Sequence, residues 1–189
     1  VVLVNGHFDP HLSRLTPGLI QVGSLKSAIE KDDAAVLAHY TKLAAFESNA
    51  LVALNTAIAA DGYYLHIPRN VQFAEPINVI HLGIGEGVAA NSRTLILVDD
   101  LSEAKVVETW YNWNAAPIWE NHVSEIFLGS GAKLELSSIQ NEIEETYSLT
   151  NFTQVVQGKD SKFTSVVMSS QGNIVRNDLQ VRHEGTGCE

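Results

Sequence analysis

The stretch TLILVDDLSEAKVVETWYNWNAAPIWENHVSEIFLGSGAKLELSSI, residues 94–139, decides the fold. It holds runs rich in β-branched, aromatic and other apolar residues, namely TLILV (94–98), AKVVETW (104–110), HVSEIFL (122–128) and KLELSSI (133–139). Turn-forming residues separate them, with Asp99 and Asp100 after the first run and Gly129 and Gly131 after the third. Short runs of this composition between turn residues predict consecutive β-strands.

The same pattern continues on both sides of this stretch. It includes YYLHI (63–67), INVIHL (77–82), SLTNFTQVV (148–156), FTSVVM (163–168) and IVRNDLQV (174–181). Because no amphipathic helix lies between these runs, a βαβ sheet is excluded on pattern, which leaves a sandwich, an antiparallel barrel or a β-solenoid. Lys133 to Ser137 alternate polar and apolar residues, as the coils of a solenoid would. No strict repeat length emerges, so the pattern favours solenoid and sandwich about equally.

The first third of the chain has a helical pattern instead. Apolar residues recur at intervals of three and four within residues 24–46 and 47–62. Ser24 is predicted to cap the first helix, and Asp32 and Asp33 to lie at the start of a second. Gly62 is predicted to end the last helix.

Two short runs before the helices, Leu3–Val4 and Leu19–Val22, are predicted to be single strands. We therefore expect N-terminal strands and a helical segment over residues 1–62, followed by a β core over residues 63–189. The chain begins with VVLVN and ends with GTGCE directly after a strand-like run. This predicts an excerpt of a longer protein.

The charge balance limits the class of partner. The chain has 189 residues with 12 Lys and Arg against 22 Asp and Glu, a formal net charge of −10. An acidic chain is a poor match for nucleic acid, since phosphate binding depends on Lys and Arg. The sequence also lacks a membrane-spanning stretch and a signal peptide, and one cysteine cannot form an internal disulfide. Together these features predict a soluble, cytoplasmic protein.

Cys188 is the candidate metal ligand of the sequence. A thiolate binds iron or carries sulfur where a neighbouring group stabilises it. In a regular strand Cys188 would face away from His183, although Gly185 and Gly187 could bend the chain. The alternative is an unreactive structural thiol.

The histidines have simpler structural explanations. His7 and His11 flank Asp9 in a segment that does not read as helical, which predicts a solvated loop. His66 and His81 lie within strand runs with no carboxylate or cysteine at a useful spacing. They are therefore expected to be partly buried structural histidines.

Two further features suggest binding without defining a site. The acidic run Glu142, Glu144 and Glu145 could collect a hard cation, although a solvated face is the alternative. Trp110, Trp113 and Trp119 could form a sugar platform or a partner site, although packing is the alternative. No nucleophile, base and oxyanion donor fall together at a workable spacing, so the sequence predicts no catalytic and no cofactor-binding residue.

Motifs in a fixed order carry a resemblance to a known family. They are VNGHF (4–8); DGYYLHIP (61–68) with EPI (75–77); Ser92–Arg93 through Val98 with AKVVE (104–108); NHVSEI (121–126) through Gly131–Ala132 to Ile139–Gln140; and GNIVRNDL (172–179). Over essentially the whole chain they resemble the SufB/SufD family of the bacterial SUF iron–sulfur cluster assembly machinery. The NG-x-F opening and the helical approach to DG-x-x-x-H-I-P favour the SufD branch over the SufB branch.

The resemblance implies a fold and a role. The fold is mainly β, a right-handed parallel β-helix (solenoid) preceded by a short α-helical segment, incomplete here at its C-terminus. The role is a non-catalytic scaffold that pairs with a SufB-like paralogue and a SufC-like ATPase. The full complex would assemble iron–sulfur clusters transiently, with no cofactor held by this chain. A carbohydrate-binding or carbohydrate-active β-helix is the alternative, and a pure interaction module is a third.

Some residue expectations follow from this fold. No family ligand is carried onto Cys188 or His183, while Arg176 and Asn177 match the family motif and are expected to satisfy backbone groups at a β-helix corner. Residues 163–168 are expected to form a core strand with Val166 buried. A solenoid that stops at residues 181–189 exposes unpaired backbone groups, which predicts that the chain either self-associates through that edge or frays its last strand. We expect a homodimer or a larger species.

Overall fold

A computed structural model describes residues 1–15, 18–47, 49–114, 116–141 and 146–189. Its strands are β1 (Val2–Val4), β2 (His7–Phe8), β3 (Gln21–Ser24), β4 (Asp61–Ile67), β5 (Ile77–Gly83), β6 (Val88–Val98), β7 (Glu103–Asn112), β8 (Ile118–Leu128), β9 (Lys133–Asn141), β10 (Tyr147–Gln157), β11 (Lys162–Ser170) and β12 (Ile174–His183). Its helices are α1 (Leu25–Glu30), α2 (Ala34–His39) and α3 (Ala50–Ile58). The predicted strand runs and the predicted helical segment are confirmed.

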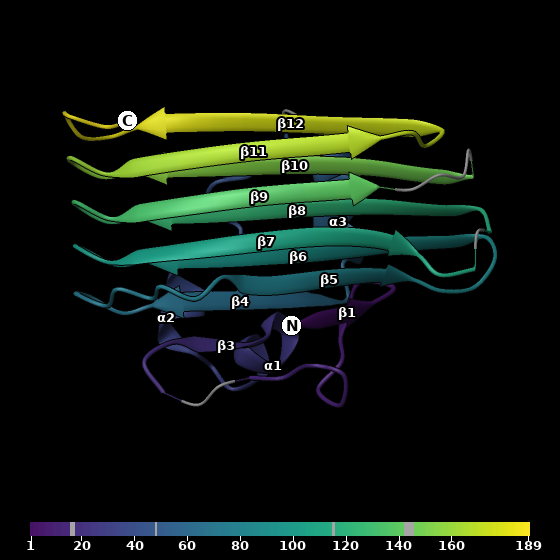
Figure 1. Cartoon of the computed structure of the whole chain (residues 1–189), viewed down its shortest axis with the longest axis horizontal. Helices are drawn as coiled ribbons and strands as arrows, with labels where there is room; N and C mark the ends of the chain where they lie inside the picture. Colours follow the sequence, from purple (N-terminus) through teal and green to yellow (C-terminus); the bar gives the residue numbers. More distant parts are fainter. Residues whose placement is uncertain (16–17, 48, 115, 142–145) are drawn as a thin grey trace.

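The strands form two facing sheets with the orders β11-β9-β7-β5-β1-β2 and β12-β10-β8-β6-β4-β3. Consecutive strands from β4 onward alternate between the two sheets, and their pairings within each sheet are parallel (Figure 1). The chain is therefore a parallel β-solenoid of about four turns. This confirms the solenoid and removes the sandwich.

Successive coils differ in length, which explains the missing repeat. Asn91 and Asn121 lie side by side 30 residues apart, and Asn121 and Thr150 lie 29 apart. One coil later, Asn151 and Asn177 lie only 26 apart. The side chains still stack in register, but a search for one fixed period finds none.

The N-terminal strands extend the same two sheets. β1 pairs in parallel with β5, and β3 pairs antiparallel with β4. Both short strands predicted before the helices are therefore present, at Val2–Val4 and Gln21–Ser24.

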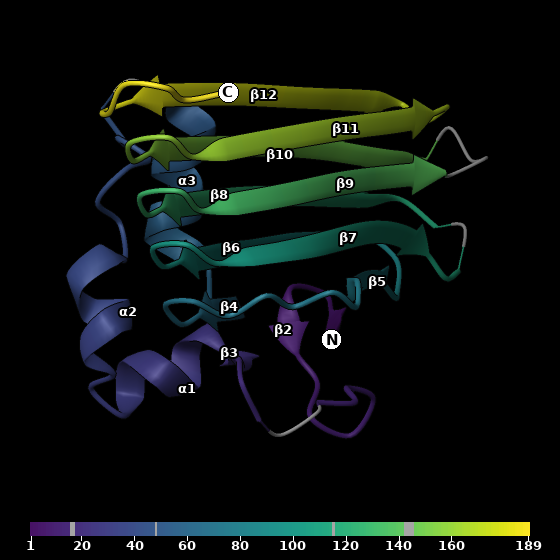
Figure 2. The ribbon, with the colours of Figure 1, turned by 60° about the vertical axis from the view of Figure 1, so that its left-hand side comes forward.

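The helices lie on the outer face of the β12-β10-β8-β6-β4-β3 sheet (Figure 2). Leu25 of α1 and Val36 of α2 pack on Leu95, while Val52 of α3 packs with Val123. The predicted caps are confirmed, because the Ser24 hydroxyl accepts from the Ser27 amide and the Asp33 carboxylate caps α2. No helix within the described ranges has the length and apolarity to cross a bilayer.

Gly62 does not end a helix, so that prediction is wrong. α3 ends at Ile58, and Gly62 lies inside β4 with φ of 157°. A Cβ at this position would overlap the backbone carbonyl of Arg93 on the adjacent strand. Glycine is needed here because two backbones approach closely. In the sequence, a glycine with this role looks the same as a glycine that ends a helix.

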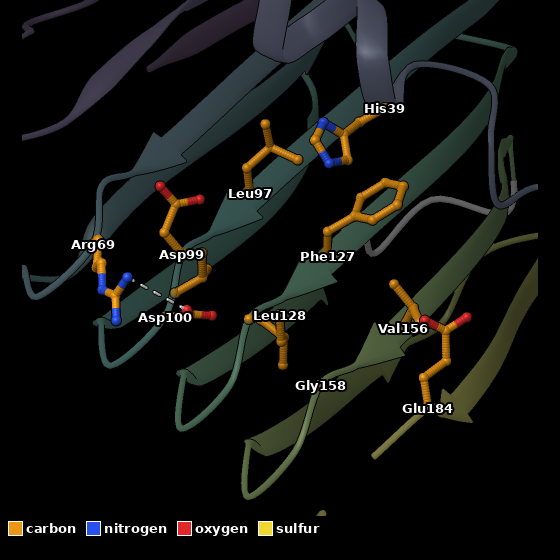
Figure 3. A pocket seen from close by; sticks show the side chains of 12 residues that line it. His39, Arg69, Leu97, Asp99, Asp100, Phe127, Leu128, Val156, Gly158 and Glu184 are labelled. Atoms are coloured by element: carbon orange, nitrogen blue, oxygen red, sulfur yellow. Dashed lines mark ion pairs between the residues drawn. The ribbon is translucent and has the colours of Figure 1, made fainter.

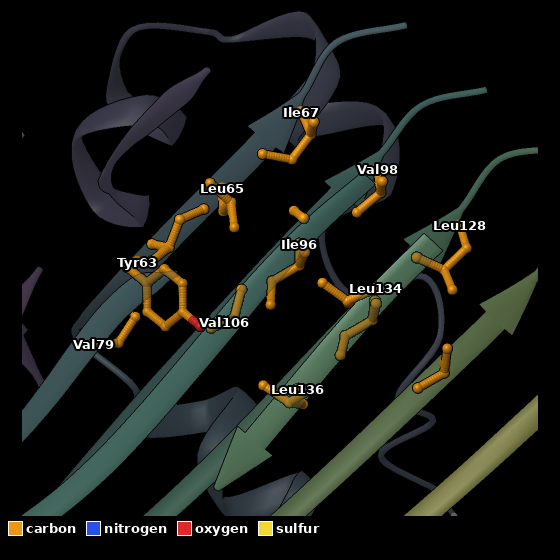
Figure 4. Packing of buried hydrophobic residues seen from close by; sticks show 14 of the residues in the cluster. Tyr63, Leu65, Ile67, Val79, Ile96, Val98, Val106, Leu128, Leu134 and Leu136 are labelled. Carbon is orange, nitrogen blue, oxygen red and sulfur yellow. The ribbon is translucent and has the colours of Figure 1, made fainter. Parts of the chain in front are cut away.

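The lumen between the sheets is filled by inward-facing apolar side chains (Figure 4). Ile96 and Val98 point into it, whereas Leu95 and Leu97 of the same strand point out toward the helices. This alternation follows from the two-residue period of a strand.

Two predictions about the last coil are wrong. Val166 is 57% exposed. It lies beside Ser137 and points to the outer face of the sheet, whereas its neighbours Ser165 and Val167 face the lumen. The predicted orientation of this strand is therefore wrong by one residue. Arg176 and Asn177 lie within β12 and contact side chains, with Arg176 Nε donating to Asp178 Oδ2 at 2.8 Å, so the expected corner role is also wrong.

Candidate functional site

A groove of about 420 Å³ lies where β4, β6, β8 and β10 end, beside α2 (Figure 3). His39, Arg69, Asp99, Asp100 and Glu184 contribute its polar side chains. Arg69 Nη1 lies 4.0 Å from an Asp100 carboxylate oxygen. Among the described residues that line it there is no Ser, Thr or Cys, so the groove offers no hydroxyl or thiol nucleophile from these residue types.

His66 meets a carboxylate at the edge of this groove. Its Nε2 lies 3.0 Å from Asp99 Oδ2. Sequence spacing does not reveal this carboxylate, because Asp99 is 33 residues from His66, about one coil along the chain. The expectation that no carboxylate lies near these histidines is therefore wrong for His66. It is also wrong for His81, whose Nε2 lies 3.7 Å from Glu108 Oε1.

A buried ion pair ties the helical segment to the outer face of the solenoid. Glu125 accepts from Arg93 Nε and Nη2, both at 3.1 Å. It also accepts from the backbone amides of Thr41 (2.9 Å), Leu43 (2.7 Å) and Ala44 (3.0 Å). Both charged side chains are essentially inaccessible, which makes this network a structural anchor.

A second polar group lies inside the lumen and consists of His81, Glu108 and His122, here called the lumen cluster. One ligand atom from each residue lies within 4.8 Å of the other two. Glu108 Oε1 lies 3.7 Å from His81 Nε2 and 3.8 Å from His122 Nε2. All three side chains are at most 2% exposed.

Both sheets contribute to the lumen cluster. His81 on β5 and Glu108 on β7 come from one sheet, and His122 on β8 comes from the other. Apolar layers close the lumen on either side, one around Val79 and Val106 and one around Trp110 and Tyr147. The cluster is therefore a polar layer enclosed by hydrophobic packing.

Hydroxyl groups surround His122. Its Nδ1 lies 2.7 Å from Ser92 Oγ, and its Nε2 lies 3.0 Å from Ser124 Oγ and 3.3 Å from Thr94 Oγ1. Burial, with a further contribution from His81, lowers the pKa of His122 to about 3. The imidazole is therefore neutral at physiological pH.

Glu108 is held as a carboxylate. Burial acts to raise its pKa, but the neighbouring His81 and His122 and the Tyr63 hydroxyl together hold the pKa below its usual value. Tyr63 donates its hydroxyl proton to Glu108 Oε1 at 2.8 Å. Burial and the nearby Glu108 charge raise the pKa of Tyr63 well above its usual value, so this hydroxyl remains a donor.

His81 has no hydrogen bond to either ring nitrogen in the part of the chain that the structure describes. Its ring stacks on Trp110 with the centroids 4.6 Å apart and the planes 9° from parallel. The His122 ring meets it edge-on at 4.9 Å. Packing therefore fixes the His81 ring with its Nε2 near Glu108.

Glu108 and His122 are site residues that the sequence pattern did not predict. The missing signal is the coil length, since Ser92 and His122 are stacked 30 residues apart. With that offset and the inward phase of each strand, His81, Glu108 and His122 fall on lumen-facing positions. Sequence spacing alone does not bring them together.

Cys188 lies away from the lumen cluster. Its Sγ is 3.2 Å from the carbonyl oxygens of Gly158 and Gly185. His183 ends β12 and is exposed. These contacts suit a structural thiol, and the metal role of Cys188 stays a prediction.

The remaining candidate residues from the sequence do not form a common site among the described residues. Asp9 accepts from the amides of His11 and Leu12, which is a turn rather than a metal site. The acidic run 142–145 lies outside the described residues. Trp110 is buried in the lumen, Trp113 is 73% exposed, and Trp119 donates its Nε1 proton to Thr150 Oγ1, so the tryptophans form no common platform.

Two family models and several curated proteins match the chain. Residues 81–189 match the family model described as "SUF system FeS cluster assembly, SufBD core domain", and residues 1–79 match "SufBD protein N-terminal region". The iron-sulfur cluster assembly protein SufD of Bacillus subtilis is 24% identical over 143 residues, which cover 74% of this chain and 33% of that protein. The iron-sulfur cluster assembly protein SufB of the same organism is 26% identical over 128 residues, 65% of this chain and 27% of that protein.

A SufBD family protein of Staphylococcus haemolyticus is 24% identical over 128 residues, again 65% of this chain and 27% of the relative. The chain thus spans about a third of the length of these curated relatives or less. The two family models together match residues 1–79 and 81–189. The chain belongs to the SufBD family of the SUF iron–sulfur cluster assembly system.

Proposed function

We propose that this chain is a non-catalytic scaffold component of iron–sulfur cluster assembly, pairing with a SufB-like paralogue and a SufC-like ATPase. The observation that carries the proposal is the match of residues 81–189 to the SufBD core domain. Within this proposal the cluster is cargo of the whole complex. The cytoplasmic location expected from the sequence stays a prediction.

The family's role in cluster assembly supports the non-catalytic part of the proposal. The groove does not decide it, because its acids and His39 could act as acids, bases or nucleophiles. The carbohydrate alternative loses its main support, because Trp110, Trp113 and Trp119 do not share a face. Screening the chain against esters, glycosides and nucleotides should give no turnover, whereas saturable turnover abolished by one point substitution would contradict the scaffold role.

Co-purification tests the partner assignment. The full chain, tagged and co-expressed with the SufB-like and SufC-like proteins of its own organism, should elute with both on size exclusion. Glu135→Gln is a control at an exposed side chain and should leave the complex intact. If none of the partners elutes with the wild-type chain, the assignment is wrong.

The open end of the last coil supports a contact between copies. β11 and β12 are the terminal strands of their sheets, so each has a backbone edge without a neighbouring strand in the described chain. Val167, Leu179 and Val181 point toward the lumen side yet are 40–48% exposed. We propose that copies of the 189-residue chain, taken by itself, associate through this end, since open strand edges with apolar flanks pair with other chains.

Matched substitutions separate this contact from general surface changes. Leu179→Lys changes the lumen side of the open coil, while Val166→Lys changes its outer face at similar exposure. Light scattering after size exclusion with reductant present should show dimers for the wild type and for Val166→Lys, and monomers for Leu179→Lys. A wild-type 20.6 kDa monomer at micromolar concentration would refute the dimer.

A further inference from the structure

We propose that the lumen cluster of His81, Glu108 and His122 binds one divalent first-row transition-metal ion of the zinc or ferrous iron type. This resident ion is distinct from any iron–sulfur cargo, and the inference does not rest on the proposed scaffold function. Two observations carry it: the donor atoms converge within 4.8 Å, and His81 has no hydrogen bond to either ring nitrogen in the described chain.

The donor set determines the class of ion. Two imidazoles with one carboxylate are a ligand set found at zinc sites and at non-haem ferrous sites with open positions. The Cys188 thiol is not part of the cluster, which makes a thiolate-bound copper(I) or an iron–sulfur cluster a poor match. A hard cation such as Mg²⁺ would prefer oxygen ligands throughout.

Binding would draw the donors closer together. Ligands at about 2.1 Å from a tetrahedral or octahedral ion lie roughly 3.0–3.4 Å from one another. In the structure Glu108 Oε1 lies 3.7 Å from His81 Nε2 and 3.8 Å from His122 Nε2, and the three donor atoms lie within 4.8 Å of one another. Side-chain rotations within the lumen have to close these gaps to bring the donors to bonding distance.

An ion would also engage the His81 ring. Glu108 is 2% exposed and faces His81, His122 and the Tyr63 hydroxyl, with no Lys or Arg partner among the residues that the structure describes. A buried imidazole nitrogen without a hydrogen bond is unfavourable. A cation between the three side chains would engage the His81 nitrogen and add to the contacts that Glu108 already makes.

Surrounding groups prepare the ligands. The Ser92 hydroxyl at 2.7 Å from His122 Nδ1 can fix the ring tautomer and leave Nε2 on the Glu108 side. The Tyr63 hydroxyl donates to Glu108, and Trp110 holds the His81 ring by stacking.

Metal titration of the full chain tests the proposal. The chain is stripped with a chelator under argon, then dialysed against Zn(II) or Co(II), with each metal added either to the folded chain or during refolding. We expect one ion per chain in at least one protocol, with Co(II) visible bands and quenched tryptophan emission, because Trp110 stacks on His81. Wild-type chain that binds under about a tenth of an ion in both protocols would overturn the proposal.

Substitutions of the proposed ligands test whether these side chains bind the ion. His81→Gln and Glu108→Gln should each weaken binding by about 100-fold. His66→Gln is the matched control, because His66 also lies beside a carboxylate but outside the lumen, and it should bind like the wild type. If His81→Gln or Glu108→Gln binds as tightly as the wild type, the proposed site is wrong.

Wild-type spectroscopy keeps the test independent of variant folding. X-ray absorption of the zinc-loaded chain should show two imidazole nitrogens and oxygen ligands in the first shell. A sulfur ligand would place the ion at Cys188 and overturn the assignment. Failure here would leave partner co-purification unchanged, so it is distinguishable from failure of the scaffold function.

Discussion

Replacing Glu125 by Gln should destabilise the chain by about 3–5 kcal/mol, the range for breaking one partner of a buried ion pair. Glu125 is fully buried and is the common acceptor for Arg93 and for the amides of Thr41, Leu43 and Ala44. Charge-assisted hydrogen bonds contribute about 1.5–3 kcal/mol each, but glutamine keeps one oxygen acceptor, so the loss is well below the sum of all these bonds. The remaining Arg93 charge stays buried without its counter-ion.

Urea unfolding measures this loss as a lower midpoint at unchanged slope. Glu135→Gln is the matched control, because it makes the same chemical change beside Lys105, with the ion pair also 3.1 Å apart but exposed. The control should cost under about 1 kcal/mol. Equal losses for Glu125→Gln and Glu135→Gln would refute the conclusion that the buried network anchors the helical segment.

Three further substitutions test the fold. Gly62→Ala should lower the thermal midpoint by several degrees, about 1–3 kcal/mol, because its methyl group meets the Arg93 backbone; an unchanged midpoint would contradict the close approach. Val106→Asp should cost more than about 4 kcal/mol and Val166→Asp under about 0.5 kcal/mol by urea unfolding, since the first side chain is buried in the lumen and the second is exposed; similar losses would show a shifted strand register. Asn49→Ala should cost about 1 kcal/mol in the same assay, because Asn49 caps the amides of Leu51 and Val52 at the start of α3, and Asn49→Asp should retain the cap.

Elements set by local chemistry could be predicted from the sequence. The strand runs, the helical segment and the caps at Ser24 and Asp33 depend on neighbouring residues, and the structure confirms them. The choice between solenoid and sandwich needed the family resemblance, because coils of 30, 29 and 26 residues give no fixed repeat. Local pattern was therefore sufficient for the elements but not for their stacking.

Features set by contact between coils were missed. Gly62 looks like a helix stop in sequence, but the nearby Arg93 backbone determines its role. Val166 lies in a run with Val167 and Met168, where apolar character alone cannot tell inward from outward positions. His81, Glu108 and His122 come from three strands, so their convergence depends on a register that only the folded solenoid fixes.

The ion pair at Glu125 also affects how the chain folds during synthesis. The amide of Ala44 leaves the ribosome 81 residues before its acceptor, Glu125. At about 5–20 residues per second this delay is roughly 4–16 s, far longer than helix formation. During that interval the apolar faces of α1 and α2, including Leu25 and Val36, have no completed sheet to cover. The nascent helical segment is thus exposed to chaperones until β6 and β8 have emerged and paired.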